Sequence, residues 1–147
     1  MTSITLTQRC LQLDNSQITS ILPLTAWERT RSRYQTETPD GVTVELRLPR
    51  GTVLQDGDLL QTAIADTLVQ VIAKPEPVLE VTSETAIDLL RAAYHLGNRH
   101  IPVEITPDYL RLEVDPVLRM MLEQLGVNVR EKIAPFQPEP GAYSAAH

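Results

Sequence analysis

Apolar and polar residues alternate with a period of two in the first half of the chain. The clearest example is residues 41–51, where valine and leucine occupy every second position over most of the stretch. This period is typical of a strand that buries one face. No segment before residue 80 has an apolar repeat of helical period over ten residues. The pattern therefore predicts a small all-β domain over residues 1–73.

The apolar period changes after residues 73–79, which contain two prolines. Proline fixes its own backbone and favours extended structure before it, so this stretch predicts a stiff linker or the start of a strand. The next apolar residues recur at the spacing of one helix face, namely Ala86, Leu89, Leu90 and Ala93. We expect Thr82 or Ser83 to cap this helix and the pair Gly97-Asn98 to end it.

Two short strands, a second helix and a last strand are predicted beyond this point. The strands are expected over residues 101–106, 109–114 and 127–133. Asp115 can cap the second helix, since Pro116 suits its first position.

The order of these elements over residues 74–134 is β-α-β-β-α-β, which is typical of a ferredoxin-like domain. Residues 135–147 contain three prolines and several small residues, and they predict a flexible C-terminal tail. The predicted fold class is therefore α+β, with a small all-β N-terminal domain, a ferredoxin-like C-terminal domain and a tail.

Composition and charge narrow the classes of function. The 147 residues carry a net charge of −6, which argues against nucleic acid as the main ligand. No apolar run approaches the roughly 18 residues that span a membrane, and no secretory signal pattern opens the chain. We therefore expect a cytoplasmic protein without a membrane partner. The single cysteine, Cys10, excludes an internal disulfide and is expected to be a buried thiol.

Two of the three histidines, His95 and His100, lie five positions apart. On a helix this spacing separates two side chains by about 140°, so the pair is not expected to chelate one ion. His95 falls in the last turn of the predicted helix, where the helix dipole favours a cation, and it is a weak candidate ligand. His100 lies beyond the helix and is either an ordinary surface or core histidine or a metal ligand.

A metal site at His100 would need ligands from outside one chain. Imidazole suits nickel, zinc and copper, and a site for such ions has about four ligands or more. A two-fold homodimer places the same patch on both sides of its axis, so two copies of His100 could share an ion. His147, at the end of the tail, is a secondary candidate. An exposed and incompletely ligated site suits delivery of a metal better than storage or catalysis.

Several segments resemble the urease accessory protein UreE family of nickel metallochaperones. They are "YHLGNRHIPVEI", "YLRLEVDPVLRMMLEQLG", "APFQPEPGAY" and, upstream, "RSRYQTETPDGVTVELRLPRGTVLQDGDLL". The resemblance implies a cytosolic homodimer, not an enzyme, that binds Ni²⁺ and works with the GTPase UreG to load the urease apoprotein. It also implies that the histidine of "GNRH", His100, is the main metal ligand, and that His147 is a variable extra ligand. Pro116 stands where some members have a histidine, so a further peripheral site is not expected.

Three arginines alternate in "WERTRSRY", namely Arg29, Arg31 and Arg33. In an extended segment they would share one face, either as a solvated face that guards a sheet edge or as a docking surface for an acidic partner. The resemblance implies a partner- or peptide-binding role for this domain.

Other classes of function fit the sequence less well. The chain has no Gly-rich phosphate loop, H-E-x-x-H, G-x-S-x-G or C-x-x-C motif of an enzyme. An RNA-recognition motif shares the β-α-β-β-α-β order but needs aromatic residues on its central strands, and the predicted strands offer few. The remaining alternative is a ferredoxin-like scaffold or small-ligand-binding protein that holds no metal.

Overall fold

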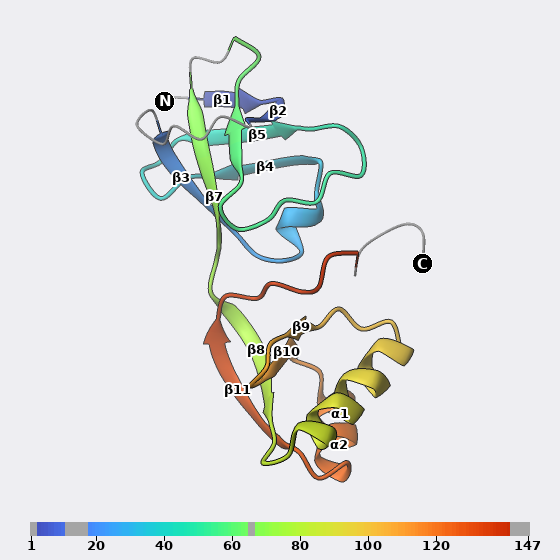
Figure 1. Cartoon of the computed structure of the whole chain (residues 1–147). Helices are drawn as coiled ribbons and strands as arrows, with labels where there is room; N and C mark the ends of the chain where they lie inside the picture. The colour runs from blue at the N-terminus through green and yellow to red at the C-terminus, as the bar shows by residue number, and fades with distance from the viewer. Residues whose placement is uncertain (1–2, 11–17, 65–66, 142–147) are drawn as a thin grey trace. The chain divides into compact units, whose positions relative to one another are not determined.

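A computed structural model describes residues 3–10, 18–64 and 67–141 (Figure 1). The chain forms two compact units, Met1–Lys74 and Pro75–His147. Among the described residues, neither helix has the length and apolar character needed to cross a bilayer.

Unit 1 consists of two small sheets. One has the strand order β1-β5-β4 and the other the order β2-β6-β7-β3. Their bounds are β1 Ser3–Leu6, β2 Gln8–Cys10, β3 Ile18–Leu24, β4 Arg33–Glu37, β5 Thr43–Arg47, β6 Leu59–Gln61 and β7 Leu68–Ala73. The described residues of this unit also include a short 3-10 helix, η2, at Glu28–Thr30.

The core of unit 1 is made by alternate residues of its strands. Val44 and Leu46 of β5 are buried, as are Val69 and Val71 of β7. This is the period of two that the sequence shows, and the prediction of a β-rich first domain is confirmed.

Unit 2 has the β-α-β-β-α-β order and an antiparallel sheet with the strand order β11-β8-β10-β9. Counted within the unit this order is 4-1-3-2, so the predicted α+β fold with a split βαβ arrangement is confirmed. Both helices cover the same face of the sheet (Figure 1). The bounds are β8 Glu76–Thr82, α1 Ala86–Asn98, β9 Glu104–Ile105, β10 Leu110–Glu113, α2 Pro116–Gln124 and β11 Asn128–Ala134.

The helix caps agree with the sequence at one helix and differ at the other. Asp115 caps α2 as predicted, because its Oδ1 accepts from the backbone N–H groups of Val117 and Leu118 at 2.9 and 3.0 Å. The cap of α1 is Thr85, whose side chain accepts from the backbone N–H of Asp88. The expectation of Thr82 or Ser83 was wrong, because β8 continues through Thr82 before the chain turns.

The chain after β11 packs against unit 2 as far as residue 139. Phe136 is completely buried, the backbone N–H of Gln137 donates to Glu104 Oε1 at 2.8 Å, and that of Glu139 donates to the Val103 carbonyl at 2.8 Å. The prediction of a flexible tail from residue 135 therefore needs correction for this part. An aromatic side chain inside the core fixes the segment that carries it.

Candidate metal site

His100 follows α1 in the left-handed backbone conformation, with a φ of 59°. Its N–H donates to the carbonyl of Gly97 at 2.9 Å, and the N–H of Ile101 donates to the carbonyl of Leu96 at 3.1 Å. These two bonds form a Schellman motif with His100 at the position that glycine usually occupies. Ile101 packs on the core cluster that contains Leu96, so the motif also has its usual apolar contact.

The side chain of His100 is exposed and lines a surface hollow of about 400 Å³. The walls come from the end of α1, the chain leading into β9 and the segment after β11. The lining residues are Ala93, Gly97, His100, Ile101, Val103, Ile105, Glu139, Pro140 and Gly141. The hollow therefore has one imidazole and one carboxylate side chain among small and apolar neighbours.

Within the described part of unit 2, the structure does not bring a second candidate ligand to this hollow. His95 lies in the last turn of α1, as predicted, and its ring contacts the Tyr94 ring edge-on at 5.4 Å, but it does not line the hollow. Cys10 is a partly exposed free thiol in unit 1, less buried than the sequence analysis expected, and His147 lies outside the described residues. Within those residues, no group of three or more His, Cys, Asp or Glu side chains could hold a metal ion.

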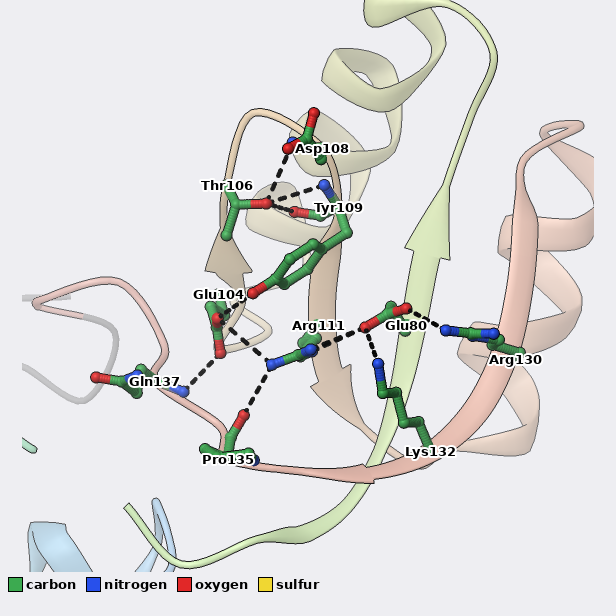
Figure 2. A network of polar contacts seen from close by, with 10 residues as sticks. All are labelled: Glu80, Glu104, Thr106, Asp108, Tyr109, Arg111, Arg130, Lys132, Pro135 and Gln137. Carbon is green, nitrogen blue, oxygen red and sulfur yellow. Dashed lines mark hydrogen bonds and ion pairs between the residues drawn. The ribbon is translucent and has the colours of Figure 1, made fainter. Parts of the chain in front are cut away.

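A charged network lies on the sheet of unit 2 and centres on Glu80 of β8 (Figure 2). Its Oε2 accepts from Arg111 Nη2 at 2.9 Å and lies 3.4 Å from Lys132 Nζ, while its Oε1 accepts from Arg130 Nη2 at 3.0 Å. Burial alone would raise the pKa of Glu80, but the hydrogen bonds from the two arginines and the charge of Lys132 outweigh it and hold this pKa below its ordinary value.

Arg111 links this network to a second buried carboxylate, that of Glu104 in β9. Arg111 Nη1 lies 3.9 Å from Glu104 Oε2 and donates to the carbonyl of Pro135 at 3.2 Å (Figure 2). Glu104 Oε2 also accepts from the Tyr109 hydroxyl at 3.3 Å. Burial, followed by the charge of Glu104, raises the pKa of Tyr109. The network thus reaches the segment that forms one wall of the hollow, because Gln137 is held by Glu104.

The three arginines of unit 1 do not share one exposed face. Arg29 is buried and donates to the carbonyl of Leu24 at 2.8 Å, because residues 28–30 form η2 in place of an extended strand. It therefore stabilises the fold and is removed from the predicted docking surface. Arg31 is exposed and stacks over the Trp27 ring at 5.2 Å. Arg33 is exposed at the start of β4, an edge strand.

The left-handed conformation of His100 and the Glu80–Arg111–Glu104 network were not anticipated from the sequence. The pair Gly97-Asn98 was expected to end the helix in the left-handed conformation, but both residues are helical and His100 takes that conformation. One feature of the sequence does indicate the network: Glu80 interrupts an apolar run, "VLEV", that is otherwise buried. A carboxylate there needs cationic partners on neighbouring strands.

Comparisons with known proteins agree on one family. The family models of the UreE urease accessory protein match the chain with the N-terminal domain over residues 4–74 and the C-terminal domain over residues 76–147. Urease accessory proteins UreE of a Nostoc species and of Nostoc punctiforme are each 57% identical over 98% of this chain, covering 98% and 97% of their own lengths. That of Thermosynechococcus vestitus is 53% identical over 96% of this chain and 98% of its own length. The matching proteins are named as accessory proteins and not as enzymes. The chain belongs to the UreE urease accessory protein family.

Proposed function

We propose that this chain is a cytoplasmic nickel metallochaperone that acts in urease maturation, and that it carries Ni²⁺ between the two His100 side chains of a homodimer. Membership of the urease accessory family supports the role in maturation. The observation that carries the metal assignment is His100 itself, an exposed imidazole in a left-handed backbone conformation at the edge of a hollow. Non-glycine residues are uncommon in such conformations, and those that adopt them cluster at functional sites.

The small number of ligands in one chain favours a shared site. The described residues offer no three-ligand cluster, and one imidazole alone holds a divalent ion weakly. A two-fold axis beside His100 would supply a second imidazole from the same position of the partner. His147 is the proposed secondary ligand. His95, which contacts Tyr94, is only a weak candidate ligand.

An apolar surface next to the hollow supports the homodimer. Leu90 and Tyr94 of α1 are 64% and 69% exposed, and Ile105 of β9 is 49% exposed. Leu90 and Ile105 also line a second hollow, which shares Ala93 and Ile105 with the hollow that contains His100. Apolar side chains of this size gathered on one face are typical of an interface. A second copy would bury this surface and bring the two imidazoles together.

Nickel is the cargo that the urease pathway requires, but the ligand set alone does not select it. Imidazole accepts nickel, zinc and copper, and for most ligand sets copper binds more strongly than nickel. Zn²⁺ and Cu²⁺ are therefore expected to compete for the site in solution. Selection of nickel over zinc and copper then depends on which metal ions are available in the cell and on the partner that receives the ion.

The proposed receivers are the accessory GTPase UreG and the urease apoprotein complex. In unit 1, Trp27 with Arg31 stacked over it, and Arg33 nearby in sequence, provide exposed aromatic and cationic groups. Arginine recognises carboxylates through paired hydrogen bonds, so an acidic surface on the urease assembly would fit this site.

Calorimetric titration of the metal-free protein with Ni²⁺, combined with sedimentation, tests the proposal. We expect a dimer that saturates near one ion per two chains, since each ion takes His100 from both subunits. His100→Ala should abolish tight binding and leave the dimer intact, while the matched control His95→Ala should bind as the wild type does. A scaffold without metal predicts no tight binding in any variant. Tight binding by a monomer would refute the shared site.

A further inference from the structure

We propose that Arg33 and Arg47 form a carboxylate-binding site on the sheet β1-β5-β4, and that this site docks an acidic segment of a partner protein. The inference rests on the docking role proposed for unit 1, and it adds Arg47 to that surface. It does not depend on nickel binding. The occupant is identified by its charge, because the two arginines face each other on an exposed surface and have one carboxylate between them.

Arg33 of β4 and Arg47 of β5 stand directly opposite each other. The two strands pair in an antiparallel register that aligns these two residues, and β4 is the edge strand of the sheet (Figure 1). At the adjacent pair, the N–H of Leu48 donates to the carbonyl of Ser32 at 2.8 Å. Hydrogen-bonded and non-hydrogen-bonded pairs alternate in such a ladder, so Arg33 and Arg47 form a non-hydrogen-bonded pair, in which opposite side chains approach most closely.

The side chains of both arginines are on the solvent-facing side of this sheet. Their neighbours along the strands, Tyr34 and Leu46, belong to the core of unit 1, so the alternation of a strand turns the arginines the other way. Arg33 is exposed, and the side chain of Arg47 is 56% exposed. Both line a surface hollow of about 330 Å³ together with Glu45.

The positive charge at this hollow exceeds the negative charge. Glu45 pairs with Arg47 alone, at 2.9 Å from Nε and 2.8 Å from Nη2, and Arg33 has no acidic partner among the residues that the structure describes. Like charges that face each other across two strands destabilise a sheet. A charge on an edge strand guards it against aggregation, but glutamate at position 33 would do so and would also attract Arg47. The second arginine is therefore explained by a ligand better than by the fold.

The free donors of the two arginines suit a carboxylate. A guanidinium carries its N–H donors in a planar fork, and the pair with Glu45 uses only Nε and Nη2 of Arg47. Nη1 of Arg47 and the whole fork of Arg33 are available to a ligand. Arginine forks match the two oxygens of a carboxylate through paired hydrogen bonds, so one acidic side chain can accept from both.

The wider charge distribution favours an acidic protein segment over nucleic acid. Arg31 precedes β4 and Arg50 follows β5, so these exposed arginines lie at the same end of the strand pair as Arg33 and Arg47. Glu37 stands at the other end of β4, which confines the positive charge to one end. A chain with a net charge of −6 repels a phosphate backbone as a whole.

Fluorescence anisotropy with the full-length protein and a labelled glutamate-rich peptide tests the site. We expect the peptide to bind at low salt and to dissociate as salt rises. Arg33→Gln and Arg47→Gln should each lower affinity about two- to fivefold. The matched control Arg91→Gln removes an exposed, ion-paired arginine of unit 2 and should bind the peptide as the wild type does. No binding by the wild type, or an equal loss in all of these variants, would overturn the inference.

Two comparisons separate paired hydrogen bonds from net charge. The double variant Arg33→Lys, Arg47→Lys keeps both charges but loses the planar forks, so it should bind the peptide more weakly than the wild type. Unchanged affinity would refute the carboxylate site, since charge alone would then attract the peptide. Single-stranded RNA of the same net charge as the peptide should bind more weakly than the peptide. Tighter binding of the RNA through the same arginines would refute the choice of an acidic protein segment.

Thermal unfolding without the peptide shows whether Arg33 serves the fold. Because Arg33 faces Arg47 across the strands, Arg33→Gln should raise the unfolding midpoint at low salt. The difference should shrink as salt screens the repulsion. A lower midpoint in Arg33→Gln would mean that the arginine stabilises the sheet, and the inference would then be wrong.

Nickel binding separates this inference from the metal assignment. Both glutamine variants should bind Ni²⁺ as the wild type does, since Arg33 and Arg47 belong to unit 1 and His100 to unit 2. If the peptide did not bind while nickel binding depended on His100, only the carboxylate site would fail. If the protein bound no nickel but the peptide bound at the two arginines, the metal assignment would fail and the carboxylate site would stand.

Discussion

Replacing His100 by glycine should stabilise the metal-free protein, although it removes the proposed metal ligand. His100 has a φ of 59° and occupies the glycine position of the Schellman motif that ends α1. A side chain with a Cβ is strained there because the Cβ approaches the following carbonyl oxygen. Glycine has no such atom, and the two backbone bonds of the motif do not use the imidazole.

The size of the effect follows from two opposing terms. Relief of the left-handed strain stabilises the folded state by about 1–2 kcal/mol. Glycine also gives the unfolded chain more freedom, which reduces the gain by roughly 0.4–1 kcal/mol. The net stabilisation is on the order of 0.5–1 kcal/mol. For a unit of this size that raises the midpoint of thermal unfolding by roughly 2–8 °C.

Thermal unfolding of the chelator-treated protein measures this difference, with His100→Ala as the matched control. Alanine loses the imidazole but keeps the Cβ, so its midpoint should lie close to that of the wild type. Both variants should lose tight nickel binding. A glycine variant no more stable than the alanine variant would refute the reasoning, since the strain would then be absent or released elsewhere.

Three further outcomes follow from the packing and charges of unit 2. Phe136→Ala should destabilise the unit by about 3–5 kcal/mol in urea unfolding, because the ring is completely buried. Thr85→Ala should cost about 1 kcal/mol by the same assay, because Thr85 caps α1, whereas Thr82→Ala should cost less than about 0.5 kcal/mol. The folded state holds the pKa of Glu80 below its unfolded value, so its contribution to stability is present above that value of about 4.3 and is lost as pH falls through the folded pKa. The unfolding free energy of Glu80→Gln should therefore change less than that of the wild type between about pH 5 and pH 3.

The periodicity of apolar residues was sufficient to predict the fold, because in each strand or helix it identifies the face that packs on the core. Every second residue of β5 faces the core of unit 1, and the helical spacing of Leu89 and Ala93 places part of α1 on the sheet of unit 2. Asp115 was recognised as a cap because Pro116 marks the first helical position. Such features are local in sequence and do not depend on which residues come together in space.

The sequence was a poorer guide where several distant segments meet. Arg29 was assigned to an exposed face on the assumption of a strand, but η2 turns it inward to Leu24. The proline-rich stretch after residue 134 suggested a flexible tail, yet Phe136 finds a place in the core. In both cases, contacts between distant segments decide whether the side chain is buried. Neither the proline content nor the spacing of the arginines predicts those contacts.

The end of α1 shows why local residue preferences are a poor guide to the conformation of a candidate site. Glycine and asparagine precede His100, and either would have satisfied the preference of a helix terminus for a left-handed residue. The chain instead continues the helix through both and gives that conformation to the histidine. A residue that breaks a local preference is expected where function opposes stability. The stability difference between glycine and histidine at position 100 therefore measures how much stability the fold gives up to place an imidazole at the proposed metal site.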